Sequence, residues 1–141
     1  MTRIEFRTDI ADKITYACRW VRKAFSLSPV PGIVLFTGDR AQLTRLDEAL
    51  WTFSDQDFLP HAAAEDRLAS RAPVILTDND AAVLPHSQIL VNLSDRIPAC
   101  FARFERLIEL VSTDEADTLA GRQRYAHYRE RGYTLHHEAV R

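Results

Sequence analysis

The sequence predicts an α/β fold, in which a mostly parallel sheet is covered by helices on both faces. Segments typical of strands alternate along the chain with segments typical of helices, which is the pattern of βαβ units. Several strand segments are short, continuous apolar runs, as expected of strands buried on both faces. The chain has 141 residues, the length of one ordinary domain. We therefore expect residues 1–141 to form a single domain.

The first strand and the first helix are predicted by two different periods. Residues 3–7 alternate between polar and apolar, which indicates a strand with one buried face. The following apolar residues recur at helical spacing and form one stripe: Ile14, Ala17, Cys18, Val21 and Phe25. Arg19, Arg22 and Lys23 occupy the other side, so this segment is an amphipathic helix, and Pro29 follows its end.

A buried strand and a second helix come next. Residues 32–37 are a continuous apolar run that Gly38 closes, and Asp39 can cap the helix that follows. The inner stripe of that helix is formed by Leu43, Leu46, Ala49 and Leu50. Residues 51–60 mix aromatic and acidic side chains without a clear period, which indicates a structured loop.

The second half of the chain contains three further strand segments. They cover residues 73–77, 89–93 and 107–111. A short helix with Pro98 in its first turn is expected between the last two of these strands.

A last helix is predicted near the C-terminus. Ser112 and Glu115 have the spacing of a capping box, and Gly132 marks the expected end of the helix. We expect the residues after it, with the adjacent His136 and His137, to form a solvated tail.

Composition limits the function classes. The formal net charge of −2 argues against a protein that binds nucleic acid strongly through overall positive charge. No signal core or membrane-length apolar run is present in the sequence. Cys18 and Cys100 each lie within an apolar pattern, which indicates buried free thiols in a reducing compartment. We therefore expect a soluble, cytoplasmic protein with no membrane association.

The motifs of common enzyme and cofactor sites are missing from the sequence. The turn at residues 36–40 contains one glycine and lacks the spacing of a phosphate-binding loop. The histidines do not show metal-ligand spacing, and no Gly-x-Ser-x-Gly motif is present. We expect no cofactor, metal or catalytic residue. Residues distant in sequence can still meet in space, so a small nucleotide-binding or hydrolytic enzyme is the alternative.

Positive charge is concentrated at the C-terminal end. Residues 121–141 contain five arginines and two glutamates, a formal charge of +3, which leaves −5 for the rest of the chain. Tyr125 and Tyr128 lie among these arginines. This combination suits a carboxylate next to an apolar side chain, but it also fits a solvated helix face with one tyrosine in the core.

A second unusual feature is a group of aromatic residues between the second helix and the third strand segment. Trp51, Phe53 and Phe58 lie within eight positions of one another. They could complete the core or form an exposed partner site, and the pattern slightly favours the core.

Several blocks of the sequence resemble the chi subunit of bacterial DNA polymerase III holoenzyme, a clamp-loader accessory subunit. The blocks are Arg45-Leu46-Asp47-Glu48-Ala49-Leu50-Trp51, residues 57–61, 89–93 and 101–104, and Arg122-Gln123-Arg124-Tyr125-Ala126-His127-Tyr128-Arg129-Glu130-Arg131-Gly132-Tyr133. They occur in the order of the family across nearly the whole chain.

The resemblance implies a Rossmann-like α/β fold without catalytic function, and two protein partners. One partner is the psi subunit, which connects chi to the clamp loader, and the other is the acidic C-terminal tail of single-stranded-DNA-binding protein (SSB). The residues implied for tail binding are Val111, Arg122, Arg124, Tyr125 and Arg129. Those implied for psi binding are Trp51, Phe53, Phe58, Pro60 and His61, a surface that a helicase-like partner can also use.

One position departs from the family pattern. Ala126 stands where the best-known members have a lysine. Tail binding would then be weaker, or would depend more on the neighbouring arginines.

Overall fold

The computed structural model describes residues 1–27, 29–52, 60–66 and 69–140. Its elements are β1 (Arg3–Ile10), α1 (Lys13–Ala24), β2 (Ile33–Phe36), α2 (Arg40–Thr52), β3 (His61–Ala63), the 3₁₀ turn η1 (Ala69–Arg71), β4 (Val74–Thr77), β5 (Ile89–Asn92), the 3₁₀ turn η2 (Phe101–Arg103), β6 (Arg106–Ser112), α3 (Glu115–Glu130) and β7 (Leu135–Ala139).

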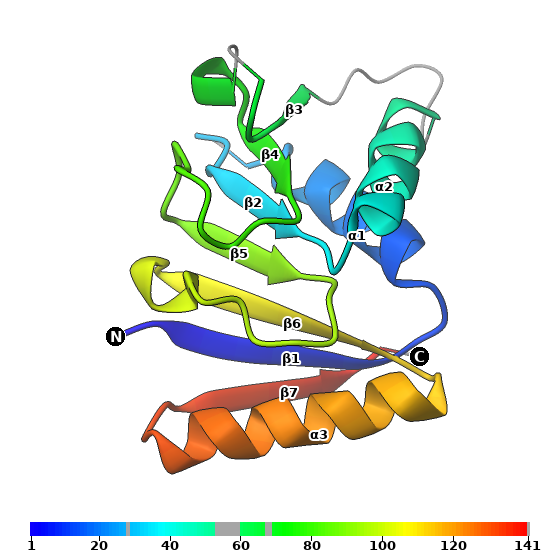
Figure 1. The fold of residues 1–141 in the computed structure, drawn as a ribbon, viewed down its shortest axis with the longest axis vertical. Coiled ribbons are helices and arrows are strands. Elements are labelled where there is room, and N and C mark those ends of the chain that lie inside the picture. Colours follow the sequence, from blue (N-terminus) through cyan, green and yellow to red (C-terminus); the bar gives the residue numbers. More distant parts are fainter. Residues whose placement is uncertain (28, 53–59, 67–68, 141) are drawn as a thin grey trace.

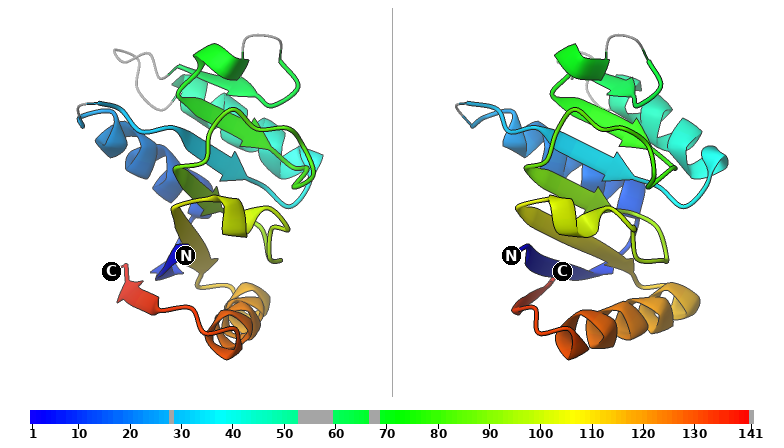
Figure 2. Two further views of the ribbon diagram at one scale, coloured as in Figure 1. Left: turned by 90° about the vertical axis from the view of Figure 1, so that its left-hand side faces the viewer. Right: turned by 60° about the vertical axis from the view of Figure 1, so that its left-hand side comes forward.

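The described strands form one seven-stranded sheet in the order β3-β4-β2-β5-β6-β1-β7, and every pair in it is parallel (Figure 1). α1 and α2 cover one face of this sheet, and α3 lies on the other (Figure 2, left). The α/β, Rossmann-like fold predicted from the sequence is therefore confirmed.

The core has two layers because successive side chains of a strand point to opposite faces. On β2, Ile33 and Leu35 pack with α1 and α2, whereas Val34 and Phe36 pack on the side of α3. All four side chains are buried, as the continuous apolar run predicts. Cys18 and Cys100 are both buried and free, which also agrees with the sequence analysis.

The start of α3 differs from the prediction. Asp114, and not Ser112, is the N-cap, because its carboxylate accepts a hydrogen bond from the Asp117 backbone N–H. Ser112 is instead the last residue of β6, where its backbone N–H donates to the Asp117 carboxylate at 2.7 Å. The predicted capping box is therefore wrong, although the helix ends near Gly132 as expected, with φ +85° at that glycine.

The C-terminal segment is a strand and not the solvated tail that we expected. β7 pairs in parallel with β1, from Ile4 opposite Leu135 to Thr8 opposite Ala139. His136 and His137 remain exposed on this edge strand. The prediction missed β7 because an edge strand whose polar residues face solvent has no continuous apolar run.

Two boundaries in the middle of the chain also differ. α2 continues through Thr52, so Trp51 lies in its last turn and not in a loop. The helix expected around Pro98 is the three-residue η2, which Pro98 precedes; the Pro98 carbonyl accepts a hydrogen bond from Phe101 N. None of the helices in the described ranges is long and apolar enough to cross a bilayer.

A polar cluster lies on the α1 side of the sheet, on β1 and β6. Glu5 accepts two hydrogen bonds from Arg106, at 2.8 and 3.1 Å, and one each from Arg3 and Arg7. Burial by itself would raise the pKa of Glu5, but the hydrogen bonds and charges of Arg106 and Arg7 outweigh it and lower this pKa to about 2. The ionised carboxylate therefore stabilises the folded chain.

We expect this cluster to make the free energy of unfolding depend on pH in the acidic range. Since the pKa of Glu5 is lower in the folded chain than its ordinary 4.5, its contribution is complete above about pH 4.5 and is lost as the pH falls towards 2. The free energy of unfolding, measured in urea, should fall between pH 6 and pH 3. This decrease should be about 1–3 kcal/mol smaller in Glu5→Gln than in the wild type. The control is Glu105→Gln, at an exposed glutamate, which should behave like the wild type. Equal losses in the wild type and Glu5→Gln would contradict this role.

Candidate functional site

A surface groove lies between α3 and the strands β1, β6 and β7. Its volume is about 370 Å³, within the range of small ligand sites. Side chains that line it include Phe6, Val111, Thr118, Arg122, Tyr125 and His137, together with the backbone of Gly121.

The groove has an apolar wall with positive charge at its edge. Val111 is buried, and the ring of Tyr125 meets that of Phe6 edge-on at a centroid distance of 5.2 Å. Arg122 is exposed on α3, and the guanidinium carbon of Arg129 lies 6.0 Å from the centre of the Tyr125 ring. Such a site suits a ligand that combines a ring or an apolar side chain with a carboxylate.

A close contact between α3 and β6 sets one end of this groove. A Cβ atom at Gly121 would lie 2.7 and 2.9 Å from the two Cγ atoms of Val111, so only glycine allows this approach. The contact holds the first turns of α3 against the strand, next to Arg122 and Tyr125.

An irregularity in β1 shapes the side of the groove that lies opposite this contact. The register between β1 and β6 shifts between Arg7 and Ile10, and Asp9 has a φ of +60°, which is rare for a residue with a side chain. Thr8 Oγ1 lies 2.6 Å from His137 Nε2, and both residues line the groove with Asp9. The irregular part of β1 is therefore the part that contributes Thr8 and Asp9 to the groove.

Four of the five residues implied for tail binding lie at or beside the groove: Val111, Arg122 and Tyr125 line it, and Arg129 lies against the Tyr125 ring. Arg124 does not, because its side chain is only 3% exposed and lies under the helix. The structure therefore removes Arg124 from the residues that could contact a ligand in the groove.

Arg124 instead belongs to a buried polar network beneath α3. The fully buried Glu109 of β6 accepts from Arg124 Nε at 3.0 Å and from Asn92 Nδ2 at 2.8 Å, and Tyr128 Oη also donates to it. Burial raises the pKa of Glu109, although the charge of Arg124 opposes this shift. Burial also raises the pKa of Tyr128. Arg124 and Tyr128 therefore attach α3 to the sheet, while Arg122 and Tyr125 are left for the groove.

The groove residues of β1 and β7 were not among the expected site residues, whereas Val111 of β6 was. Phe6 was part of a recognised strand, but nothing showed which helix would cover it. His137 is expected in a tail, but the pairing of β7 with β1 places it opposite Phe6, and its side chain reaches Thr8.

A separate aromatic feature lies at the end of α2. Trp51 is 54% exposed, so it does not complete the core, and its ring lies 4.6 Å from the His61 ring. The His61 side chain is almost fully buried, with Nε2 3.1 Å from Asp47 Oδ1, and Pro60 is half-buried beside it. The predicted partner residues Phe53 and Phe58 lie outside the described residues.

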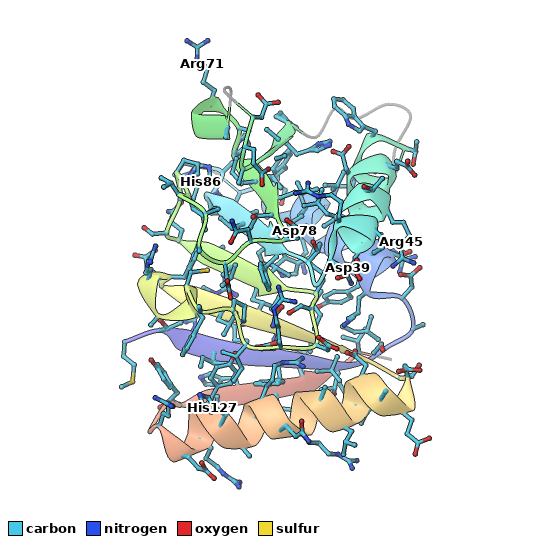
Figure 3. The ribbon with its side chains drawn as sticks, in the orientation of Figure 1. Asp39, Arg45, Arg71, Asp78, His86 and His127 are labelled. Carbon is cyan, nitrogen blue, oxygen red and sulfur yellow. The ribbon has the colours of Figure 1, made fainter. Side chains whose placement is uncertain are left out.

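The turn between β2 and α2 is not arranged for a phosphate. The Gly38 N–H donates to Gln42 Oε1 at 2.7 Å, and the Gln42 N–H donates to Asp39 Oδ1 at 2.8 Å, which confirms the predicted capping role of Asp39. The Arg96 guanidinium donates to the Gly38 carbonyl at 2.8 Å. The amides of Gly38 and Gln42 therefore already have side-chain acceptors and are not free for a phosphate. Asp39 and Asp78 lie at this same edge of the sheet (Figure 3).

The fold and the site define a Rossmann-like α/β protein with a small apolar groove bordered by arginines. Among residues 1–27, 29–52, 60–66 and 69–140, no three or more His, Cys, Asp or Glu side chains gather as metal ligands would.

Comparison with known proteins identifies the family. Residues 1–136 match the family described as DNA polymerase III chi subunit, HolC. DNA polymerase III subunit chi of Pseudomonas aeruginosa is 34% identical over 139 residues, which cover 96% of this chain and 94% of that protein. The subunits chi of Haemophilus influenzae and Escherichia coli are each 27% identical, over 77% and 73% of this chain and 75% and 70% of their own lengths. The chain therefore belongs to the DNA polymerase III chi subunit family, and is an accessory subunit in DNA replication.

The Gly121 contact gives a testable consequence. Gly121→Ala should lower the free energy of unfolding by about 1–2 kcal/mol, because overpacking against Val111 outweighs the gain of about 1 kcal/mol in helix propensity. Denaturant unfolding in the Val111→Ala background provides the control, since the smaller side chain removes the collision. If Gly121→Ala is equally destabilising in both backgrounds, the contact with Val111 is not its cause.

Proposed function

We propose that this subunit is a non-catalytic adaptor of the bacterial replicase. It links the clamp-loader complex, through the psi subunit, to the acidic C-terminal tail of SSB. Family membership supports the replicase context, and the groove beside α3 supports the tail contact because it combines an apolar wall with arginines.

The groove is the observation that carries the proposal. A tail that ends in phenylalanine offers a ring, an α-carboxylate and upstream aspartates. The ring fits beside Tyr125 and Val111, while Arg122 supplies two N–H donors to the carboxylate. Arg129 lies on the outer side of Tyr125 and can face the aspartates. The solvated contacts should increase the association rate and weaken with salt, while the apolar contacts set the lifetime.

Arg122→Ala tests the tail site directly. A micromolar complex corresponds to about −8 kcal/mol, and one charge-assisted hydrogen bond contributes about 1.5–3 kcal/mol. We therefore expect a 10- to 100-fold loss of affinity for an SSB tail peptide, measured by calorimetry. Arg131→Ala, at an exposed arginine that follows α3, is the matched control and should bind like the wild type. If Arg122→Ala and the wild type bind equally well, the tail does not use this groove.

Ala126→Lys tests the departure from the family pattern. Ala126 follows Tyr125 on α3 and is half-buried, so a lysine there can extend towards the acidic part of the peptide. We expect tighter peptide binding, with a gain that decreases between 50 mM and 500 mM salt. A gain that does not change with salt would show that charge is not its source.

We also propose that the end of α2 binds the psi subunit. The residues that we assign to this contact are Trp51, Phe53, Phe58, Pro60 and His61, and a helicase-like partner can use them too. The buried His61 side chain would act by supporting the exposed Trp51 ring, 4.6 Å away. The exposed ring of Trp51 supports the proposal, because large exposed aromatics are typical anchors of protein interfaces.

Trp51→Ala separates an interface role from a structural one. Because Trp51 is 54% exposed, its removal should change the thermal midpoint little, but it should weaken psi binding by about 2 kcal/mol, or roughly 30-fold. Val83→Ala removes another exposed apolar side chain and should leave psi binding unchanged. Unchanged psi binding in Trp51→Ala would exclude this residue as an anchor.

A further inference from the structure

A second groove lies on the opposite face of the sheet, between α1 and the adjoining strands. Its volume is about 520 Å³. The side chains that carry its charge and aromatic surface are Arg7, Tyr16, Arg19, Trp20, Lys23 and Arg106. None of them lines the groove beside α3, so the two sites are separate.

The α1 wall alternates aromatic rings and cations. Tyr16, Arg19, Trp20 and Lys23 follow the spacing 0, 3, 4 and 7, which places them on one side of the helix. The rings of Tyr16 and Trp20 are half-buried and pack at the border of the core, one helical turn apart. Arg19 and Lys23 are exposed between and beyond them.

The strand wall adds two guanidinium groups that are held in place. Arg7 and Arg106 both donate to Glu5, and their side chains keep 17% and 31% exposure. Counting Glu5 and the lining residue Glu138 as −1 each, the four cations leave this groove at +2 in a chain of −2. The positive charge is therefore local and does not reflect the composition of the chain.

We propose that this groove binds single-stranded nucleic acid, weakly and without sequence preference. Cations along a groove contact the phosphates, and aromatic rings stack on bases of any kind, which is how sequence-independent single-strand sites are built. An acidic peptide would use the arginines but would give the two rings no equivalent partner. The residues that carry the proposal lie on α1, β1 and β6, and none of them belongs to the tail site.

The number of cations fixes the salt dependence. Three or four phosphate contacts on a single strand give a slope of about −2 to −3 in log affinity against log salt. Affinity should then fall about 20- to 50-fold between 50 and 200 mM NaCl. Weak binding of this kind is compatible with the expectation that the chain does not bind nucleic acid strongly through its overall charge.

Fluorescence anisotropy with a labelled 20-nucleotide oligothymidine at 50 mM NaCl tests the proposal on the full chain. Lys23→Glu should weaken binding at least tenfold, whereas Arg71→Glu should not; Arg71 is an exposed arginine of η1, at the far end of the sheet from β7 (Figure 3). Trp20→Leu keeps an apolar side chain against the core but removes the ring, and should weaken binding about 5- to 100-fold. Circular dichroism confirms that each variant is folded before its binding is measured.

The proposal would be overturned by no binding at 50 mM NaCl, by equal weakening in Lys23→Glu and Arg71→Glu, or by equal competition from a poly-glutamate peptide. Arg122→Ala distinguishes this site from the tail site, since it should leave oligothymidine binding intact. Loss of both activities in Arg122→Ala would place the nucleic acid in the groove beside α3, and would also contradict the inference.

Discussion

The position of α3 depends on a carboxylate buried in the sheet. Glu109 of β6 holds Arg124 and Tyr128, which lie about one turn apart on the inner side of the helix, and it also accepts from Asn92 of β5. Arg122 and Tyr125 come from the same turns but project into the groove, so their placement is set by contacts that are themselves inaccessible. Asn92 extends the network to the loop after β5, where its side-chain oxygen accepts from Ser94 N and Oγ.

The members of this network depend on one another because a buried charged group is unfavourable without its partner. Glu109 is fully buried, and the side chain of Arg124 is 3% exposed. The two Nη atoms of Arg124 have no hydrogen-bond partner among the described residues, so Glu109 is its main electrostatic compensation. Removing either charge leaves the other buried and unpaired, which costs more than removing both. The groove can therefore be disturbed by a residue that no ligand touches.

Much of the fold could be predicted because the strands of the sheet interior are apolar on both sides, and β2, β4 and β5 are recognisable from that alone. β7 could not, since it pairs on one side only and carries His136, His137 and Glu138. Arg124 and Tyr128 are four residues apart and therefore share one face of α3, but this spacing does not tell which face is buried. That depends on Glu109, whose charge is inconspicuous within the apolar run of residues 107–111. Val111, Arg122 and Tyr125 followed from the family resemblance, whereas Phe6 and His137 join the groove only through the pairing of β1 with its neighbours.

A double-mutant cycle on Glu109 and Arg124 tests the dependence of α3 on this network most directly. The measured quantity is the free energy of unfolding of the wild type, Glu109→Leu, Arg124→Met and the double variant, from denaturant titrations at neutral pH. Each single variant should lose about 3–5 kcal/mol, because one buried charge remains unpaired. The double variant should be more stable than the sum of the single losses implies, by at least about 2 kcal/mol, since the two apolar side chains need no partner. Additive losses, or single variants within about 1 kcal/mol of the wild type, would show that α3 is held by apolar packing alone.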